Sequence, residues 1–348
     1  METFWFIALT FMLIMYVVLD GFDLGAGIIY LLVGKSNHER RTILHAIGPV
    51  WDGNEVWLIA AAGVLYFAFP LLYASGFSGF YLPLMLVLWL LMLRGIGIEF
   101  RHHIHNPMWQ AFWDVVFSIA SVLLTIFFGA ALGNVVRGVP LNAEGYFFEP
   151  FWTTFTVVPE AGILDWFTVL MGLVALLTLT SHGANYVAMK TEKEVMQRSR
   201  TIARVTSLLV LIFSIFALAA TAAIRSTIWD NYLSHPFGFI FPLLGFFGLE
   251  GMIYYRIRYN DTLAFLSSSA FIVGMGASTA FALYPNLLPA STNPVYNLTI
   301  YNTAAGAHGL RVGLVWWSIG MILTAAYFTY LFYSFRGKVK VPAEGEGY

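Results

Sequence analysis

The sequence GPVWDGNEVWLI occupies residues 48–59, and the apolar run VWLIAAAGVLYFAFPLLYA extends it over residues 56–74. This run is hydrophobic and long enough to cross a bilayer, which takes about 20 apolar residues in a helix. Two carboxylic acids, Asp52 and Glu55, stand three residues apart at its head, where burial of a charge is costly. The role of these acids depends on what kind of chain carries them.

Composition places the chain in a membrane. Of its 348 residues, 59% are hydrophobic and only 11% are charged, whereas a soluble domain has about 25% charged residues. No soluble fold of this length could bury so much apolar surface, so the chain is an integral membrane protein. The net charge of −1 argues against a nucleic-acid partner. The absence of cysteine excludes disulfides, thiolate metal sites and haem attachment through a Cys-x-x-Cys-His motif.

Apolar runs of spanning length predict an all-α integral membrane protein with nine transmembrane helices in a single polytopic domain over residues 1–348. The first run has neither a basic n-region nor a small-residue cleavage site, so we interpret it as a retained span and not as a signal peptide. The predicted spans are 4–32, 55–74, 77–97, 113–136, 163–188, 204–225, 237–255, 262–284 and 309–334.

The basic residues predict the orientation of these spans. Of the 18 Lys and Arg residues, only Arg137, Arg225 and Arg311 fall on one side of the nine predicted helices. The other fifteen, from Lys35 to Lys340, fall on the opposite side. Because cytoplasmic loops carry the excess of Lys and Arg, we expect the N-terminus outside and the C-terminus in the cytoplasm.

A faint internal similarity suggests tandem halves. Residues 19–41 loosely resemble residues 180–200, each beginning at the end of an outside-to-inside span and containing small residues before a basic end. Such similarity is also common among unrelated spans. The interpretation is a pair of four-helix units, 1–136 and 163–284, followed by a ninth helix over 309–334.

Two acids within the first span are the hardest feature to explain as ordinary structure. An Asp near the centre of a membrane helix costs roughly 2.5 to 3.5 kcal/mol, so such a residue usually faces a cavity, a partner or an ion path. The spacing of Asp20 and Asp23 places both on one helix face. Other titratable groups also fall in the cytoplasmic half of the predicted spans: Asp52, Glu55, Glu99, Asp114, His182 and Glu250.

Each of these groups has a simpler interpretation. Asp52 could cap its helix, and Arg94 or Glu99 could belong to ordinary interfacial ion pairs. The histidines of the RHHIH stretch at 101–105 are more typical of a solvated loop than of a metal site. His182 is more often a satisfied polar contact than a ligand. The tryptophans near the span ends fit an interfacial aromatic belt.

The motifs of covalent and phosphoryl chemistry are missing: there is no phosphate-binding glycine loop and no helix with paired metal-ligating histidines. What remains is a set of proton-exchanging groups leading into the membrane from the cytoplasm. Residue chemistry alone leaves two functions open, an autonomous proton-coupled transporter and a subunit of a larger proton-coupled machine.

Several segments together resemble subunit II of the cytochrome bd-type quinol oxidases, from the first span to the last. They are DGFDLGAG at 20–27, GPVWDGNEVWLI at 48–59, FSGFY at 77–81, RGIGIEFR at 94–101, FWD at 112–114, GNVVRGVPLN at 133–142 and YPNLLPAST at 284–292. The resemblance favours the oxidase subunit over the transporter. It implies two four-helix bundles plus one peripheral helix in a bacterial or archaeal cytoplasmic membrane.

The resemblance also implies partners and chemistry. The chain would form a heterodimer with a subunit I that carries haems b558, b595 and d and the quinol site, and a small single-helix accessory subunit could join them. The complex would oxidise quinol and reduce O₂ to water with cytoplasmic protons, generating a proton-motive force. This chain would hold no catalytic centre, haem, other cofactor or metal; it would support subunit I and contribute to the access of protons.

Individual positions follow from the matching motifs. The family's acid in the W-D-G-N motif falls on Asp52. The implied proton pathway comprises Asp20, Asp23, Asp52, Glu55, Glu99 and Asp114. Some relatives have Gln in place of Glu55 and Asp in place of Glu99, so these two are weaker candidates. Trp57 matches a tryptophan associated with gas access in only some relatives.

Overall fold

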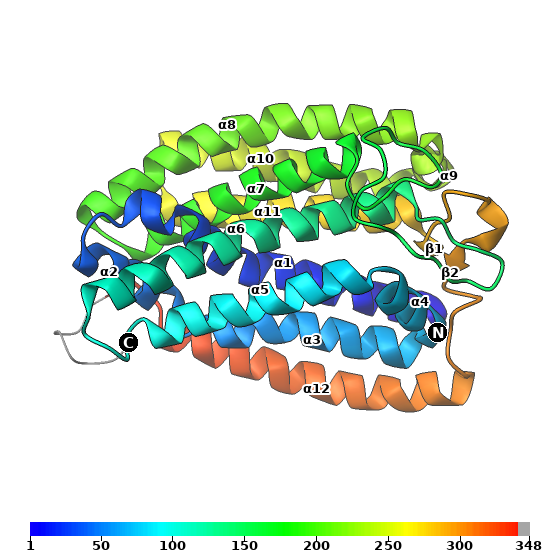
Figure 1. Cartoon of the computed structure of the whole chain (residues 1–348), viewed down its shortest axis with the longest axis horizontal. Coiled ribbons are helices and arrows are strands. Elements are labelled where there is room, and N and C mark those ends of the chain that lie inside the picture. Colours follow the sequence, from blue (N-terminus) through cyan, green and yellow to red (C-terminus); the bar gives the residue numbers. More distant parts are fainter. Residues whose placement is uncertain (340–348) are drawn as a thin grey trace.

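The long apolar runs form helices that lie side by side along the longest axis of the molecule (Figure 1). The structure is a computed structural model that describes residues 1–339; Lys340, counted above among the basic residues, lies outside them. Eight helices in the described part are long and apolar enough to span a membrane: α1 (Glu2–Val33), α5 (Tyr81–Phe100), α6 (Pro107–Arg137), α7 (Trp166–Lys190), α8 (Lys193–Ile224), α10 (Ile240–Ile257, extended at its start by η2, Pro236–Phe239), α11 (Asp261–Leu283) and α12 (Ala307–Ser334).

The predicted second span is divided in two. Helix α3 (Trp51–Ala68) ends two residues before Pro70, where α4 (Pro70–Gly79) starts. Proline lacks an amide hydrogen and disfavours a helical residue before it, and Phe69 accordingly leaves the helix. The expected continuous helix over 55–74 is therefore wrong. Helix α3 also starts earlier than expected, which places Asp52 in its first turn.

Short elements connect the helices at the two ends of the bundle. At the end that we call the α2 end, α2 (Asn37–Ile47) follows α1 and begins with a capping box made by Ser36 and Glu39. This polar helix has no apolar run and was not predicted. The opposite end, which we call the strand end, carries η1 (Ser226–Trp229), α9 (Asp230–Ser234), β1 (Asn286–Leu288), η3 (Pro294–Tyr296) and β2 (Leu298–Thr299, antiparallel to β1).

Helix α1 occupies the middle of the bundle and packs against α3, α6, α7 and α11. Small residues permit its closest approach: Gly25 on α1 lies directly against Gly183 on α7. Tightly packed glycines are a usual means by which membrane helices associate, because lipid offers no hydrophobic driving force between them. Helix α12 lies at the periphery, and none of the residues in its most apolar stretch is buried.

Candidate functional site

Asp20 is paired with a buried arginine. Arg94 on α5 donates from Nη1 to Asp20 Oδ2 on α1 over 2.7 Å and from Nη2 to Glu55 Oε2 on α3 over 3.1 Å. The side chains of Asp20 and Arg94 are 0% and 1% exposed, whereas that of Glu55 is 22% exposed. Three helices are thus joined near the α2 end by one guanidinium group.

Asp23 extends this cluster along α1. Its Oδ2 accepts a 2.7 Å hydrogen bond from Asn54 Nδ2 on α3. Asp23 and Asn54 are both buried, and the second carboxylate oxygens of Asp20 and Asp23 have no partner among the described residues. Three carboxyl groups therefore share one cation. With all three ionised, the cluster would carry two uncompensated charges in apolar surroundings, which is costly, so the cluster is suited to holding and exchanging protons.

Asp52 lies at the exposed edge of this cluster. It stands three residues before Glu55 in the first turn of α3, and its side chain is exposed. The cap residue of α3 is Val50, which makes no side-chain cap bond. The interpretation of Asp52 as a hydrogen-bonding cap of its helix is therefore wrong. An acid in a first turn still interacts favourably with the helix dipole. Glu99, near the end of α5, is also exposed.

Asp114 belongs to a second cluster at the same end. It accepts hydrogen bonds from Tyr30 Oη at 2.5 Å, Arg101 Nε at 2.5 Å and Arg40 Nη1 at 2.9 Å, and its side chain is 1% exposed. Two arginines and a hydroxyl group thus hold one carboxylate. Such an arrangement is typical of a fixed ion pair that ties helix ends together.

His182 and Glu250 lie apart from both clusters. His182 Nδ1 is 2.7 Å from Ser268 Oγ and Nε2 is 2.9 Å from the carbonyl oxygen of Val18, while the ring stacks on Phe265. The interpretation of His182 as a satisfied polar contact is confirmed. Glu250 lies on an exposed face of α10. Although it was grouped with the other acids of the predicted spans, it does not join their clusters.

Sequence reasoning missed the cation at the centre of the site. Arg94 was interpreted as an ordinary interfacial residue, whereas it is fully buried. The signal was present, because Arg94 lies within the predicted span 77–97 and its charge would otherwise face lipid. Asn54 gave no comparable signal, since its contact with Asp23 depends on how α1 and α3 pack.

The chain matches one protein family over nearly its whole length. The family model described as "Cytochrome bd terminal oxidase subunit II" matches residues 1–335. The chain belongs to this family. Membership makes it a multi-pass protein of the cytoplasmic membrane and a subunit of a respiratory oxidase, and it gives no support to the transporter alternative.

Individual relatives span nearly the whole subunit. The chain is 29% identical to the "Cytochrome bd-I ubiquinol oxidase subunit 2" of Escherichia coli strain K12, covering 96% of this chain and 94% of the relative. It is 28% identical to the "Cytochrome bd ubiquinol oxidase subunit 2" of Bacillus subtilis, covering 88% of each. A chain in the structure of bd oxidase from Geobacillus thermodenitrificans has the same fold, with a TM-score of 0.75 and 17% identity over 96% of this chain and 98% of that one.

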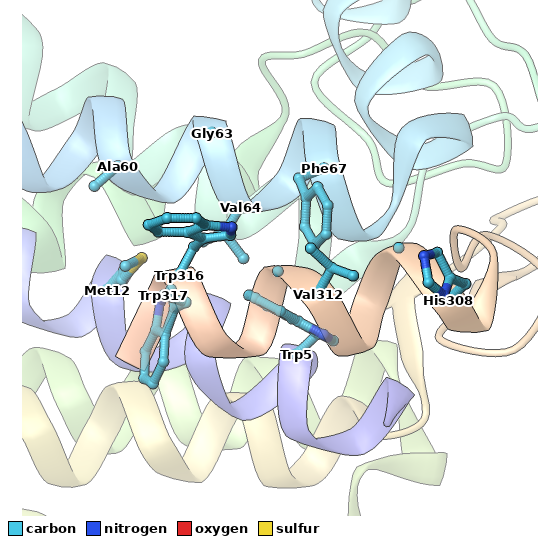
Figure 2. A pocket seen from close by; sticks show the side chains of 12 residues that line it. Trp5, Met12, Ala60, Gly63, Val64, Phe67, His308, Val312, Trp316 and Trp317 are labelled. Carbon is cyan, nitrogen blue, oxygen red and sulfur yellow. The ribbon is translucent and has the colours of Figure 1, made fainter. Parts of the chain in front are cut away.

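Trp57 is buried in this subunit II fold. It lies on α3, 6% exposed, with its ring against Phe11 and Phe328. A separate apolar cavity of about 600 Å³ lies between α1, α3 and α12 toward the strand end (Figure 2). Its lining is Trp5, Met12, Ala60, Gly63, Val64, Phe67, His308, Gly309, Val312, Gly313, Trp316 and Trp317. Trp57 does not line this cavity.

A further buried ion cluster holds the loop 138–165 at the strand end. Arg137 donates to Glu149 and to Asp165, and all three side chains are buried. Asp165 Oδ1 also caps α7, whereas Glu149 Oε2 has no partner in the described chain. Burial raises the pKa of Glu149 from 4.5 to about 7, an increase that the neighbouring Arg137 only partly offsets.

The raised pKa of Glu149 predicts a pH-dependent stability. Below pH 4.5 the group is protonated in both the folded and unfolded states; between pH 4.5 and about 7 only the unfolded state loses the proton. Native stability should therefore fall as pH rises through this window, by about 3 kcal/mol for this group. We expect Glu149→Gln to remove the fall in thermal unfolding scans at several pH values. Glu144→Gln, an exposed acid in the same loop, should leave it unchanged; equal profiles for both variants would contradict the assignment.

Proposed function

We propose that this chain is the non-haem subunit of a quinol:O₂ oxidoreductase that gives cytoplasmic protons access to a haem-bearing subunit I. The observation that supports this most is the cluster of three carboxyl groups around Arg94, which lies next to the exposed Asp52. Quinol as the electron donor is inferred from the Escherichia coli and Bacillus subtilis relatives, which are ubiquinol oxidase subunits by name.

The acids are arranged from exposed to buried. Asp52 is exposed, Glu55 is 22% exposed, and Asp20 and Asp23 are buried deeper on α1. The buried carboxyl groups outnumber the single arginine beside them. A proton taken up at the exposed end could therefore pass to one of these buried groups. Glu99 is exposed at the same end of the bundle and Asp114 is buried there, and we assign both a supporting role.

Asp52→Asn tests the proton-access role. The amide has nearly the same shape but carries no exchangeable carboxyl proton at neutral pH, so we expect quinol oxidase turnover to fall several-fold while haem content stays normal. Asp52→Glu should retain more activity than Asp52→Asn. Turnover and visible haem spectra of the purified complex provide the measurement. Normal turnover of a fully assembled Asp52→Asn complex would exclude the acid from proton transfer.

We also propose nine spans with the N-terminus outside and the C-terminus in the cytoplasm. Helix α3 with α4 forms the span that adds to the eight more apolar helices. The fifteen-to-three distribution of basic residues supports this orientation. A reporter fused to the C-terminus should be cytoplasmic and one inserted beside Asn142 external. Two reporters on the same side would exclude the proposed topology.

Two ion clusters, around Asp114 and around Asp261, support the tandem halves, 1–136 and 163–284, with a ninth helix over 309–334. Asp114, at the start of α6, is held by arginines from the segment after α1 and from the end of α5. Asp261, at the start of α11, is held in the same way by Arg200, after α7, and by Arg256, near the end of α10. Equivalent positions in two four-helix units thus carry equivalent ion clusters.

Subunit I would cover the face formed by α5, α3 and α12. The first turn of α3 lies between the other two helices, with Trp51 against Gly95 and Gly53 near Tyr327. A lipid-facing carboxylate is costly, so the exposed Asp52 favours protein cover here. We place haems b558, b595 and d in subunit I, because both nitrogens of the buried His182 are already hydrogen-bonded. A single-helix accessory subunit and gas access near Trp57 remain parts of this proposal.

A further inference from the structure

Asn185 lies in the interior of the second half with a side chain that no protein group satisfies. It is 0% exposed, and neither its Oδ1 nor its Nδ2 has a hydrogen-bond partner in residues 1–339. Arg256, 2% exposed, is in a similar position: Nη2 donates to Asp261 over 2.6 Å, but Nε and Nη1 have no partner there. Buried polar groups without partners are rare, because each one costs about 1 to 3 kcal/mol.

Contacts one turn away place these two side chains at the same level of the bundle. Ser181 Oγ on α7 lies 3.5 Å from Ser207 Oγ on α8 and 3.4 Å from Met252 Sδ on α10. Residues four apart share a helix face. One turn toward the α2 end from this contact, α7 presents Asn185 and α10 presents Arg256.

The same step along α8 leads to a small side chain. Helix α8 runs opposite to α7, so the residue one turn from Ser207 toward the α2 end is Ala203, which is fully buried. Helix α8 therefore supplies only a methyl group at this level, and no polar side chain of α8 satisfies Asn185.

The donor and acceptor set identifies that molecule. Arg256 offers two donors and no acceptor, whereas Asn185 offers both a donor and an acceptor. Asp261 is shared between Arg256 and Arg200, so its single charge offsets only part of the two guanidinium charges. An anion could accept from Arg256 but would leave Asn185 Oδ1 without a donor. Water both accepts and donates, and buried water typically makes about three such bonds.

We propose that the second half binds an ordered water molecule between Asn185 and Arg256, beside Ala203. The water joins α7 to α10 and orients the guanidinium that holds Asp261 at the start of α11.

A density map of the intact oxidase complex in lipid nanodiscs, at a resolution that shows ordered water, tests the site. We expect a single compact density within about 2.7 to 3.2 Å of Asn185 and of Arg256. Direct bonding of the two side chains, or of both to other protein groups, with no density between them would overturn the proposal. A branched or elongated density would also overturn it, because that shape indicates an anion or a lipid headgroup.

A pair of matched variants provides a second measurement. Ala203→Asn should bring an amide to the place of the water, remove the density, and leave the apparent melting temperature of the complex unchanged or raised. Ala220→Asn places the same amide elsewhere on α8, at a buried position packed among apolar side chains, and should lower that temperature by several degrees. Equal losses in both variants would contradict a polar site beside Ala203.

Discussion

Replacing Arg94 by Gln is expected to abolish assembly of the oxidase complex. The guanidinium lies fully buried between Asp20 and Glu55, and its loss leaves a buried carboxylate without a cation. Breaking a buried ion pair from one side costs about 3 to 5 kcal/mol, a large part of the stability of a typical domain. Recovery of the assembled complex from membranes and its visible haem spectrum measure the effect.

A double variant separates the effect of the uncompensated charge from the effect of losing a large side chain. The double variant Arg94→Gln with Asp20→Asn removes both charges of the buried pair, and we expect it to recover assembly relative to Arg94→Gln alone. As a control, Arg198→Gln removes an arginine that is 35% exposed and paired with Glu39, a change worth about 0 to 1 kcal/mol. Assembly of Arg94→Gln at the level of Arg198→Gln would refute the compensating role of Arg94.

The helices could be predicted because membrane spans depend on length and apolarity alone. Eight of the nine predicted spans coincide with long apolar helices of the described chain. The remaining predicted span, over 55–74, is divided at Pro70. The sequence contains this break, but hydropathy does not detect it. Helix α2 was missed because its stability comes from a capping box at Ser36 and from packing of one face, not from an apolar run.

The candidate site could be predicted only in part. Asp20 and Asp23 were identified because an acid inside a span needs a physical explanation. Their partners come from other helices: Arg94 is on α5 and Asn54 is on α3. Periodicity describes one helix at a time and cannot tell which neighbour meets it. For the same reason Asp114 could be placed at the start of a span, but not at the centre of a separate ion cluster.

Gly25→Ala is expected to prevent the fold that brings these partners together. A Cβ atom at Gly25 would overlap the carbonyl oxygen of Leu179 and would lie 2.7 Å from the Cα atom of Gly183. Both neighbours are backbone atoms of α7, so no side-chain rotation can relieve the overlap, and α1 and α7 would have to separate. The hydrogen bond between His182 and the carbonyl of Val18, which joins the same two helices over 2.9 Å, would then be lost.

The consequence for function follows from the position of α1. It contributes residues to the Arg94 cluster on one side and packs against α7 on the other, so moving it displaces Asp20 and Asp23 from their partners. We expect fluorescence-detected size exclusion to show no assembled complex for Gly25→Ala. Gly63→Ala is the matched control, since nothing lies within 4 Å of its added Cβ and alanine stabilises a helix by roughly 0.5 to 1 kcal/mol over glycine. If Gly25→Ala assembles as well as Gly63→Ala, α1 and α7 do not cross at this distance, and the geometry of the whole site would have to be different.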